Sequence, residues 1–149
     1  MATTDVRAGA LEALITDVPA DRPLALVNLL RFADEAEIDG ERLTGREAYE
    51  RYVRELEPTI VAVGGRPVFR GDARTMLIGP SEERWDEVIV AYPNRRAFER
   101  LVASAAFEAA SSLRVAALRD ARLIAVASPR RIGRALGLAY ALSIRLRRR

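Results

Sequence analysis

The most restrictive feature of the sequence is a nine-residue segment, LALVNLLRF (24–32), that is apolar on both of its alternating sides. Its length and its Leu and Val content predict a buried β-strand. Successive side chains of a strand point to opposite faces of the sheet, and here both sets are apolar apart from Asn28 and Arg31. A sheet built on this strand needs cover on both faces. We therefore expect helices of the chain on one face and a second copy of the protein on the other.

Helix signals lie on either side of this strand. A short helix is predicted over 5–16. Thr44 and Glu47 have the spacing of a capping box, which predicts that a second helix begins there. Pro58 is expected to kink or restart this helix, and Gly64-Gly65 to end it. The acid-rich segment between strand and helix, 33–43, is interpreted as a solvated loop.

The second half of the chain contains strands and further helical segments. Residues 66–72 and 74–80 are predicted to pair as a tight antiparallel hairpin around 71–73. A strand over 85–93 follows, and Asn94 can cap an amphipathic helix. The Ala-rich sequence stays helical through 118, and a last strand is predicted over 121–128.

The element order predicts an α+β fold. Strand, helix, strands, helix and strand in this sequence are typical of a ferredoxin-like split βαβ arrangement, with an antiparallel sheet and both helices on one face. With 149 residues, half of them hydrophobic, the chain has material for one core. We divide it into an N-terminal helical extension (1–21), the ferredoxin-like domain (22–128) and a basic tail (129–149).

Composition excludes several classes of chemistry. The sequence has no Cys, His or Lys. Disulfides, thiolate or imidazole metal sites, Ser-His-Asp triads and Schiff-base chemistry are therefore excluded. The acid-rich loop lacks the spacing of a calcium loop, and no glycine-rich phosphate loop is present. We expect no metal, no cofactor and no specific nucleic-acid partner.

The C-terminal tail has a charge opposite to that of the rest. The net charge is +3, yet residues 129–149 contain seven Arg and no acidic residue. A helix there would be apolar on most sides, which is typical of a segment that docks on a membrane surface, on another protein or on its own domain. The other interpretation is a disordered basic tail, or one that binds RNA nonspecifically. The residues expected to dock are Arg134, Leu138, Tyr140, Leu142, Arg145 and Arg147.

Several ordered motifs resemble a known family. The runs LVNLLRF, GREAYERYVRELEPTIVAVGGRPVFRG, IGPSEERWDEVIVAYPNRRAFERLV and AFEAASSLRVAALRDARLI are similar to DUF1330, a domain of unknown function, over roughly 22–128. That family belongs to the dimeric α/β-barrel superfamily, so the resemblance implies two protomers that pair sheet to sheet. The superfamily includes cofactor-free monooxygenases, lactone isomerases and haem enzymes, and its breadth leaves the activity open.

Three residues are candidates for catalysis. Asn28 is a strongly polar residue within an apolar strand, and it either holds a substrate oxygen or bonds a neighbouring backbone group. Arg70, on a predicted strand, either pairs with a carboxylate or faces an anionic ligand. Glu87 is a candidate general base if burial raises its pKa, or else an exposed residue or a partner of Arg.

Five further residues are candidates for substrate binding: Arg31, Tyr49, Tyr52, Trp85 and Arg114. Tyr49 and Tyr52 share the helix face that packs on the sheet, where tyrosines either fill the core or orient a ligand. Trp85 suits an interface or a flat ligand. Arg31 pairs with a carboxylate or meets an anionic ligand. Arg114 matches an Arg position of the family, and it is also interpreted as a clamp between helix and sheet.

Two functions follow as hypotheses. The first is a small cofactor-independent enzyme, of oxygenase or isomerase type, that binds a flat or lipophilic molecule. The second is a noncatalytic dimeric subunit whose tail docks on a membrane or a larger complex. The N-terminus lacks the features of a signal peptide, so we expect a cytoplasmic protein, peripheral at the membrane if the tail docks there.

Overall fold

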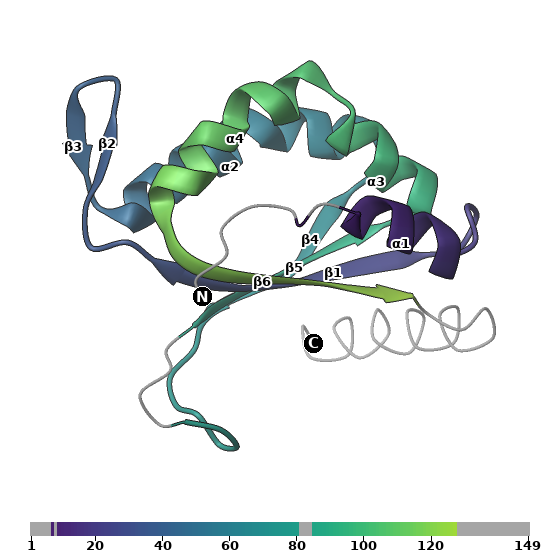
Figure 1. Cartoon of the computed structure of the whole chain (residues 1–149), viewed down its shortest axis with the longest axis horizontal. Coiled ribbons are helices and arrows are strands. Elements are labelled where there is room, and N and C mark those ends of the chain that lie inside the picture. The colour runs from purple at the N-terminus through teal and green to yellow at the C-terminus, as the bar shows by residue number, and fades with distance from the viewer. Residues whose placement is uncertain (1–6, 8, 81–84, 128–149) are drawn as a thin grey trace, which may run out of the picture.

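The computed structural model describes residue 7 and residues 9–80 and 85–127, which form one antiparallel sheet with helices on one face (Figure 1). The sheet has the strand order β4-β5-β1-β6, and a separate two-stranded hairpin is formed by β2 and β3. The helices are α1 (Ala10–Asp17), α2 (Gly45–Ala62), α3 (Arg95–Val102) and α4 (Ala105–Ala117). The strands are β1 (Leu24–Phe32), β2 (Ala36–Ile38), β3 (Glu41–Leu43), β4 (Arg66–Asp72), β5 (Asp86–Tyr92) and β6 (Leu118–Ala127).

This arrangement confirms the predicted ferredoxin-like α+β fold. The predicted strand over 24–32 coincides with β1, which lies at the centre of the sheet between β5 and β6. Leu24, Leu26 and Leu30 of β1 are almost fully buried under the helices. Their burial against α2, α3 and α4 provides the main hydrophobic stabilisation of the domain.

The capping signals placed the helices correctly. The hydroxyl oxygen of Thr44 accepts a hydrogen bond from the Glu47 N–H, and the Glu47 carboxylate accepts one from the Thr44 N–H at 2.8 Å. The Asn94 side chain likewise accepts from the Ala97 N–H and begins α3. Helix α2 continues through Pro58 to Ala62, so the expected restart does not occur. Ser104 caps a separate helix, α4, where the sequence predicted continuous helix.

The predicted hairpin between 66–72 and 74–80 is wrong. Strand β4 pairs with β5 instead, and the ladder runs on through Asp72 opposite Asp86 to the Ala73 N–H, which donates to the Trp85 carbonyl. Leu77 is 90% exposed in the connection that follows. Strand β5 is rich in β-branched residues and is itself paired with β1. Pairing β4 with β5 therefore extends the sheet, and this is more favourable than a local hairpin with 74–80.

The loop predicted over 33–43 is also more ordered than expected. Strands β2 and β3 form a small hairpin there, and Ala36 and Ile38 are buried against the core. The turn uses Asp39 and Gly40, both with positive φ. Two apolar side chains at alternate positions are enough to fix this hairpin on the domain, although acidic residues surround them.

The sheet face turned away from the helices, which we call the open face, is apolar except at the end near Arg31. Cross-strand register places the following residues on it: Ala25, Val27, Leu29, Phe69, Ala91, Ile124 and Val126. Phe69 is 53% exposed and Ile124 is 50% exposed. The helices lie on the opposite side (Figure 1).

The start of α2 is locked to the sheet by backbone contacts. The Gly45 N–H donates to the Ala33 carbonyl, and the Ala33 N–H donates to the Ala117 carbonyl. A Cβ atom at position 45 would lie 2.4 Å from the Ala33 oxygen and 2.5 Å from the Ala117 oxygen. Only glycine allows three backbone segments to approach this closely.

Gly45→Ala is therefore expected to lower the free energy of unfolding by about 3 kcal/mol, at the upper end of overpacking costs, because backbone rather than a flexible side chain must move. Urea unfolding followed by circular dichroism measures this loss. Gly40→Asn is the matched control: position 40 has positive φ, which Asn tolerates, and open space around it. A Gly45→Ala protein as stable as the control would contradict the role of this junction.

Candidate functional site

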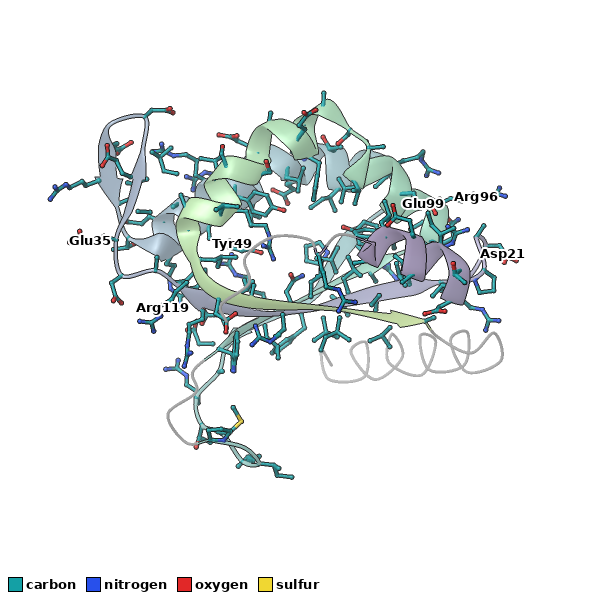
Figure 2. All side chains as sticks on the ribbon, in the orientation of Figure 1. Asp21, Glu35, Tyr49, Arg96, Glu99 and Arg119 are labelled. Carbon is teal, nitrogen blue, oxygen red and sulfur yellow. The ribbon has the colours of Figure 1, made fainter. Side chains whose placement is uncertain are left out.

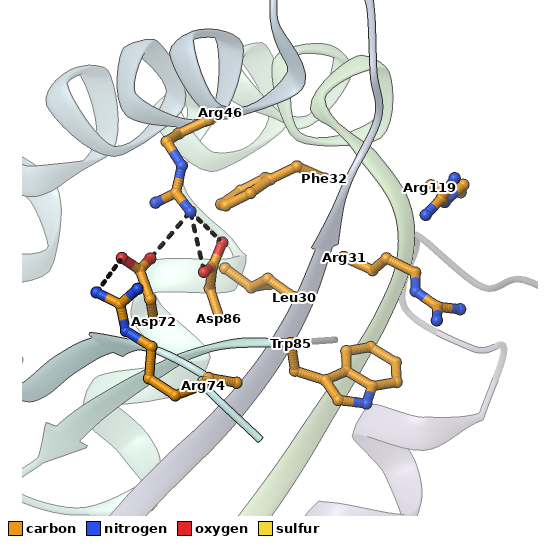
Figure 3. A pocket seen from close by; sticks show the side chains of 10 residues that line it. Leu30, Arg31, Phe32, Arg46, Asp72, Arg74, Trp85, Asp86 and Arg119 are labelled. Carbon is orange, nitrogen blue, oxygen red and sulfur yellow. Dashed lines mark hydrogen bonds and ion pairs between the residues drawn. The ribbon is translucent and has the colours of Figure 1, made fainter. Parts of the chain in front are cut away.

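Two adjoining groups of polar residues form the candidate site. The first, which we call the polar layer, lies between the sheet and the helices and consists of Asn28, Tyr49, Tyr52, Arg70 and Arg114. The second is a pocket of about 390 Å³ at one end of the sheet, which we call the sheet-end pocket. Its lining residues are Leu30, Arg31, Phe32, Arg46, Asp72, Ala73, Arg74, Trp85, Asp86 and Arg119 (Figure 3).

The polar layer is held together by tyrosine–arginine contacts. Tyr49 extends from α2 towards the sheet (Figure 2), and its ring centroid lies 5.3 Å from that of Tyr52. Burial raises the pKa of Tyr49 to about 12, and the positive charges of Arg114 and Arg70 oppose this shift. Burial also raises the pKa of Tyr52, whose phenol is hydrogen-bonded to Arg114. Both phenols are therefore neutral at pH 7.

The sheet contributes the other two members of the polar layer. Asn28 of β1 is 9% exposed, and Arg70 of β4 forms an ion pair with Glu50 at 3.6 Å. Both pair in register with Val88 of β5, so they share the helix-covered face, two strands or roughly 10 Å apart. The structure thus brings five of the eight sequence-predicted catalytic and binding residues into one layer.

Two more predicted residues, Arg31 and Trp85, line the sheet-end pocket instead. The guanidinium carbon of Arg31 lies 5.6 Å from the Trp85 ring centroid, and that of Arg122 lies 5.5 Å from it. Trp85 is 8% exposed. It points to the opposite side of β5 from Asp86, so the pocket wraps around the end of the sheet (Figure 3).

The chemical centre of the pocket is a pair of carboxyl groups held by one arginine. Nη2 of Arg46 lies 2.9 Å from an oxygen of Asp72 and 3.0 and 3.1 Å from the two oxygens of Asp86. The guanidinium also lies over the Phe32 ring, 4.8 Å from its centroid. The two aspartates are directly opposite each other in the β4–β5 ladder.

The environments of the two carboxyl groups push their pKa values apart. Burial, together with the hydrogen bond to Asp72, raises the pKa of Asp86. The same hydrogen bond, together with Arg46, lowers the pKa of Asp72. A pair of carboxyl groups whose pKa values are pushed apart in this way is suited to general acid and base catalysis.

The remaining sequence-predicted residues lie beyond what the structure describes. Glu87 pairs through its backbone with Leu29 and Gly71, but its side chain is outside the described residues. The docking residues of the tail, from Arg134 to Arg147, are outside them as well. Over the described ranges, none of the helices combines the length and apolarity needed to cross a membrane.

Sequence reasoning missed Arg46, Asp72 and Asp86. Arg46 is the second residue of a capped helix, where a charged side chain is ordinary. Asp72 was placed in a turn by the wrong hairpin, so nothing indicated that it would meet Asp86. The available signal was the position of each aspartate at the end of a strand.

Arg46→Met is expected to destabilise the protein at pH 7, and the loss should shrink as the pH falls towards 3. Arg46 stabilises the carboxyl groups while they are ionised, so its contribution is present above their pKa values and lost below them. Because the pKa of Asp86 is raised, the stabilisation that Arg46 provides starts to disappear at a higher pH than it would beside an ordinary aspartate. Urea unfolding of wild type and Arg46→Met at pH 7, 5 and 3 measures the difference in stability between them at each pH.

The control for this prediction is Arg54→Met, which removes an exposed arginine from the same helix. A difference between wild type and Arg46→Met that is equal at pH 7 and pH 3 would show that Arg46 acts through its packing on Phe32 rather than through charge.

Comparison with known proteins supports the fold and shows the family. Among solved structures, RPA0582, a protein of unknown function from Rhodopseudomonas palustris, is 31% identical with a TM-score of 0.79, covering 87% of this chain and 99% of that one. The methylated form of RPA0582 gives 32% identity, the same TM-score, and coverage of 87% and 96%.

A dimeric protein of unknown function with a ferredoxin-like fold from Bacteroides fragilis is 9% identical, with a TM-score of 0.45 and coverage of 71% and 96%. No curated protein matches the chain. The family model described as "Domain of unknown function (DUF1330)" matches residues 38–128, more than half of the sequence. The chain therefore belongs to the DUF1330 family.

Proposed function

We propose that the protein is a small cofactor-independent enzyme of the isomerase type, which moves a proton on a flat organic molecule bound in the sheet-end pocket. The observation that carries this proposal is the contact of Arg46 with both Asp72 and Asp86 in that pocket. Of the two reaction types expected from the sequence, isomerisation fits better because it needs only an acid and a base.

The two carboxyl groups take complementary roles. Asp72, whose pKa is lowered, is ionised and accepts a proton from a carbon next to a carbonyl group of the substrate. Asp86, whose pKa is raised, donates its proton to another atom of the same molecule. The proton count of the pair is unchanged, and transfer across the hydrogen bond from Asp72 to Asp86 restores the starting form. Asp72 thus takes the general-base role that the sequence assigned to Glu87.

The polar layer extends this site into the domain. Arg70 lies two residues before Asp72 on β4, and Asn28 lies two residues before Leu30 on β1, so both occupy the next row of the same sheet face. We assign to Asn28 and Arg70 the polarisation of a substrate oxygen. Trp85 forms a flat wall of the pocket, and Tyr49, Tyr52 and Arg114 support the layer from the helices.

The proton-transfer role predicts hydrogen–deuterium exchange on an enolisable aromatic compound. Phenylpyruvate in D₂O should lose the proton NMR signal of its CH₂ group faster with the protein than in buffer. Asp86→Asn and Asp72→Asn should each slow this exchange by about a hundredfold, the usual contribution of one acid or base.

Asp17→Asn, which alters an exposed aspartate of α1, is the control and should exchange at the wild-type rate. Exchange by Asp86→Asn and Asp72→Asn at that rate would remove the acid–base pair from the mechanism, and a wild-type rate equal to that of buffer would exclude the proposed function for this compound class.

We also propose that two copies of the protein pair through the open face. Phe69, Ile124 and Val126 are about half exposed there, and they adjoin the apolar residues of β1 in one continuous surface. A contiguous apolar surface of this kind on a small domain is typical of an interface, and a face that meets its own copy suits two-fold symmetry.

Sedimentation velocity tests the dimer. Ile124→Glu would place a charge in the centre of the interface, so the variant should sediment as a monomer where the wild type sediments as a dimer. Val61→Glu is the matched control on the solvent side of α2, where Val61 is 60% exposed, and it should stay dimeric. A dimeric Ile124→Glu protein would place the interface elsewhere.

A further inference from the structure

We propose that the sheet-end pocket selects an aromatic carboxylate, whose carboxylate group binds Arg31 and Arg119 and whose ring lies against Trp85. This inference rests on the proposed function, since it names the substrate class of the same pocket. It is argued from the charge balance of the pocket, from the surroundings of Arg31 and from the position of Trp85.

The pocket has more positive than negative charge. Four arginines line it, Arg31, Arg46, Arg74 and Arg119, against the two aspartates Asp72 and Asp86. Arg46 contacts both aspartates, and Arg74 lies 3.9 Å from Asp72. The two aspartates of the pocket thus pair with Arg46 and Arg74, and Arg31 and Arg119 contact neither of them.

Arg31 and Arg119 are the two lining arginines that contact neither aspartate of the pocket. Arg31 makes no ion pair with any carboxylate in the described part of the chain, and its Nε is buried there without a hydrogen-bond partner. Arg119 lies 3.8 Å from Asp34, which is 93% exposed in its side chain, so solvent screens this pair. Both arginines are on the same side of the pocket (Figure 3). Guanidinium groups bind a carboxylate through paired N–H donors, which makes this class of anion the natural partner.

Trp85 explains why the anion should be aromatic. The indole ring is a flat, largely buried surface next to Arg31, and Phe32 adds a second ring to the pocket wall. Aromatic ligands pack on such surfaces by offset or edge-to-face contacts. A pocket of about 390 Å³ is large enough for a single substituted ring.

Intrinsic fluorescence tests this inference directly, because Trp85 is the only tryptophan of the chain. Full-length protein is titrated with benzoate and with benzamide, a probe of the same shape without charge. Benzoate should change the emission saturably, and benzamide should bind at least tenfold more weakly. Arg31→Gln should weaken benzoate binding at least tenfold, whereas Arg54→Gln, at an exposed position of α2, should leave it unchanged.

Arg119→Gln provides a second variant in case Arg31→Gln fails to fold, because Arg119 is exposed and should tolerate substitution. It should weaken benzoate binding several-fold. Equal binding of benzoate and benzamide, benzoate binding that survives loss of either arginine, or no saturable change would each overturn the inference.

Benzoate has no enolisable carbon, so its binding is measured without turnover. Binding without phenylpyruvate exchange would overturn the proposed reaction alone, and exchange without benzoate binding would overturn the carboxylate specificity alone.

Discussion

The close backbone contact at Gly45 determines how the helix layer sits on the sheet. At this point the end of β1, the start of α2 and the end of α4 meet through two backbone hydrogen bonds. Because the first residue of α2 is fixed there, the next turns of the helix are fixed as well. Arg46 then lies above the end of the sheet, and Tyr49 and Glu50 lie above its next row. The placement of a single residue without a side chain thus positions the charged groups of the site.

The sheet-end pocket brings three charged side chains, Arg46, Asp72 and Asp86, into contact. Two aspartates opposite each other in neighbouring strands repel when both are ionised. Arg46 offsets that repulsion, and the hydrogen bond between the two carboxyl groups raises the pKa of Asp86 and lowers that of Asp72. The folded protein therefore holds two neighbouring carboxyl groups whose pKa values are pushed in opposite directions, in a pocket lined by aromatic rings.

The sequence was sufficient for the features that depend on local pattern. The strand 24–32, the capping box at Thr44 and the cap at Asn94 follow from residue type and spacing, and each was confirmed. The failures concern pairing between distant segments. Whether 66–72 pairs with 74–80 or with 86–92 depends on the whole sheet, and a local apolar run carries no information about it.

The residues of the candidate site likewise divide into those that local sequence pattern indicates and those that depend on strand pairing. Tyr49 and Tyr52 were placed on the sheet-facing side of a helix by their spacing, as the structure shows. Arg46, Asp72 and Asp86 come together across 26 and 40 residues of sequence, so their contact depends on strand register that only the folded chain defines. Predicting them would have required the correct partner of β4.

The two outer strands of the sheet differ in how well they resist unwanted association. An unpaired strand edge is a template on which another chain can add a strand. On β4, Pro67 removes one backbone donor, and the shift in register between Pro67 and Phe69 disturbs the edge further. On β6, charged residues that disfavour the addition of another strand occur only in the first half. The second half, LIAVA (123–127), has no charged residue, Pro or Gly. Partly folded chains should therefore associate more readily through the edge formed by β6 than through the edge formed by β4.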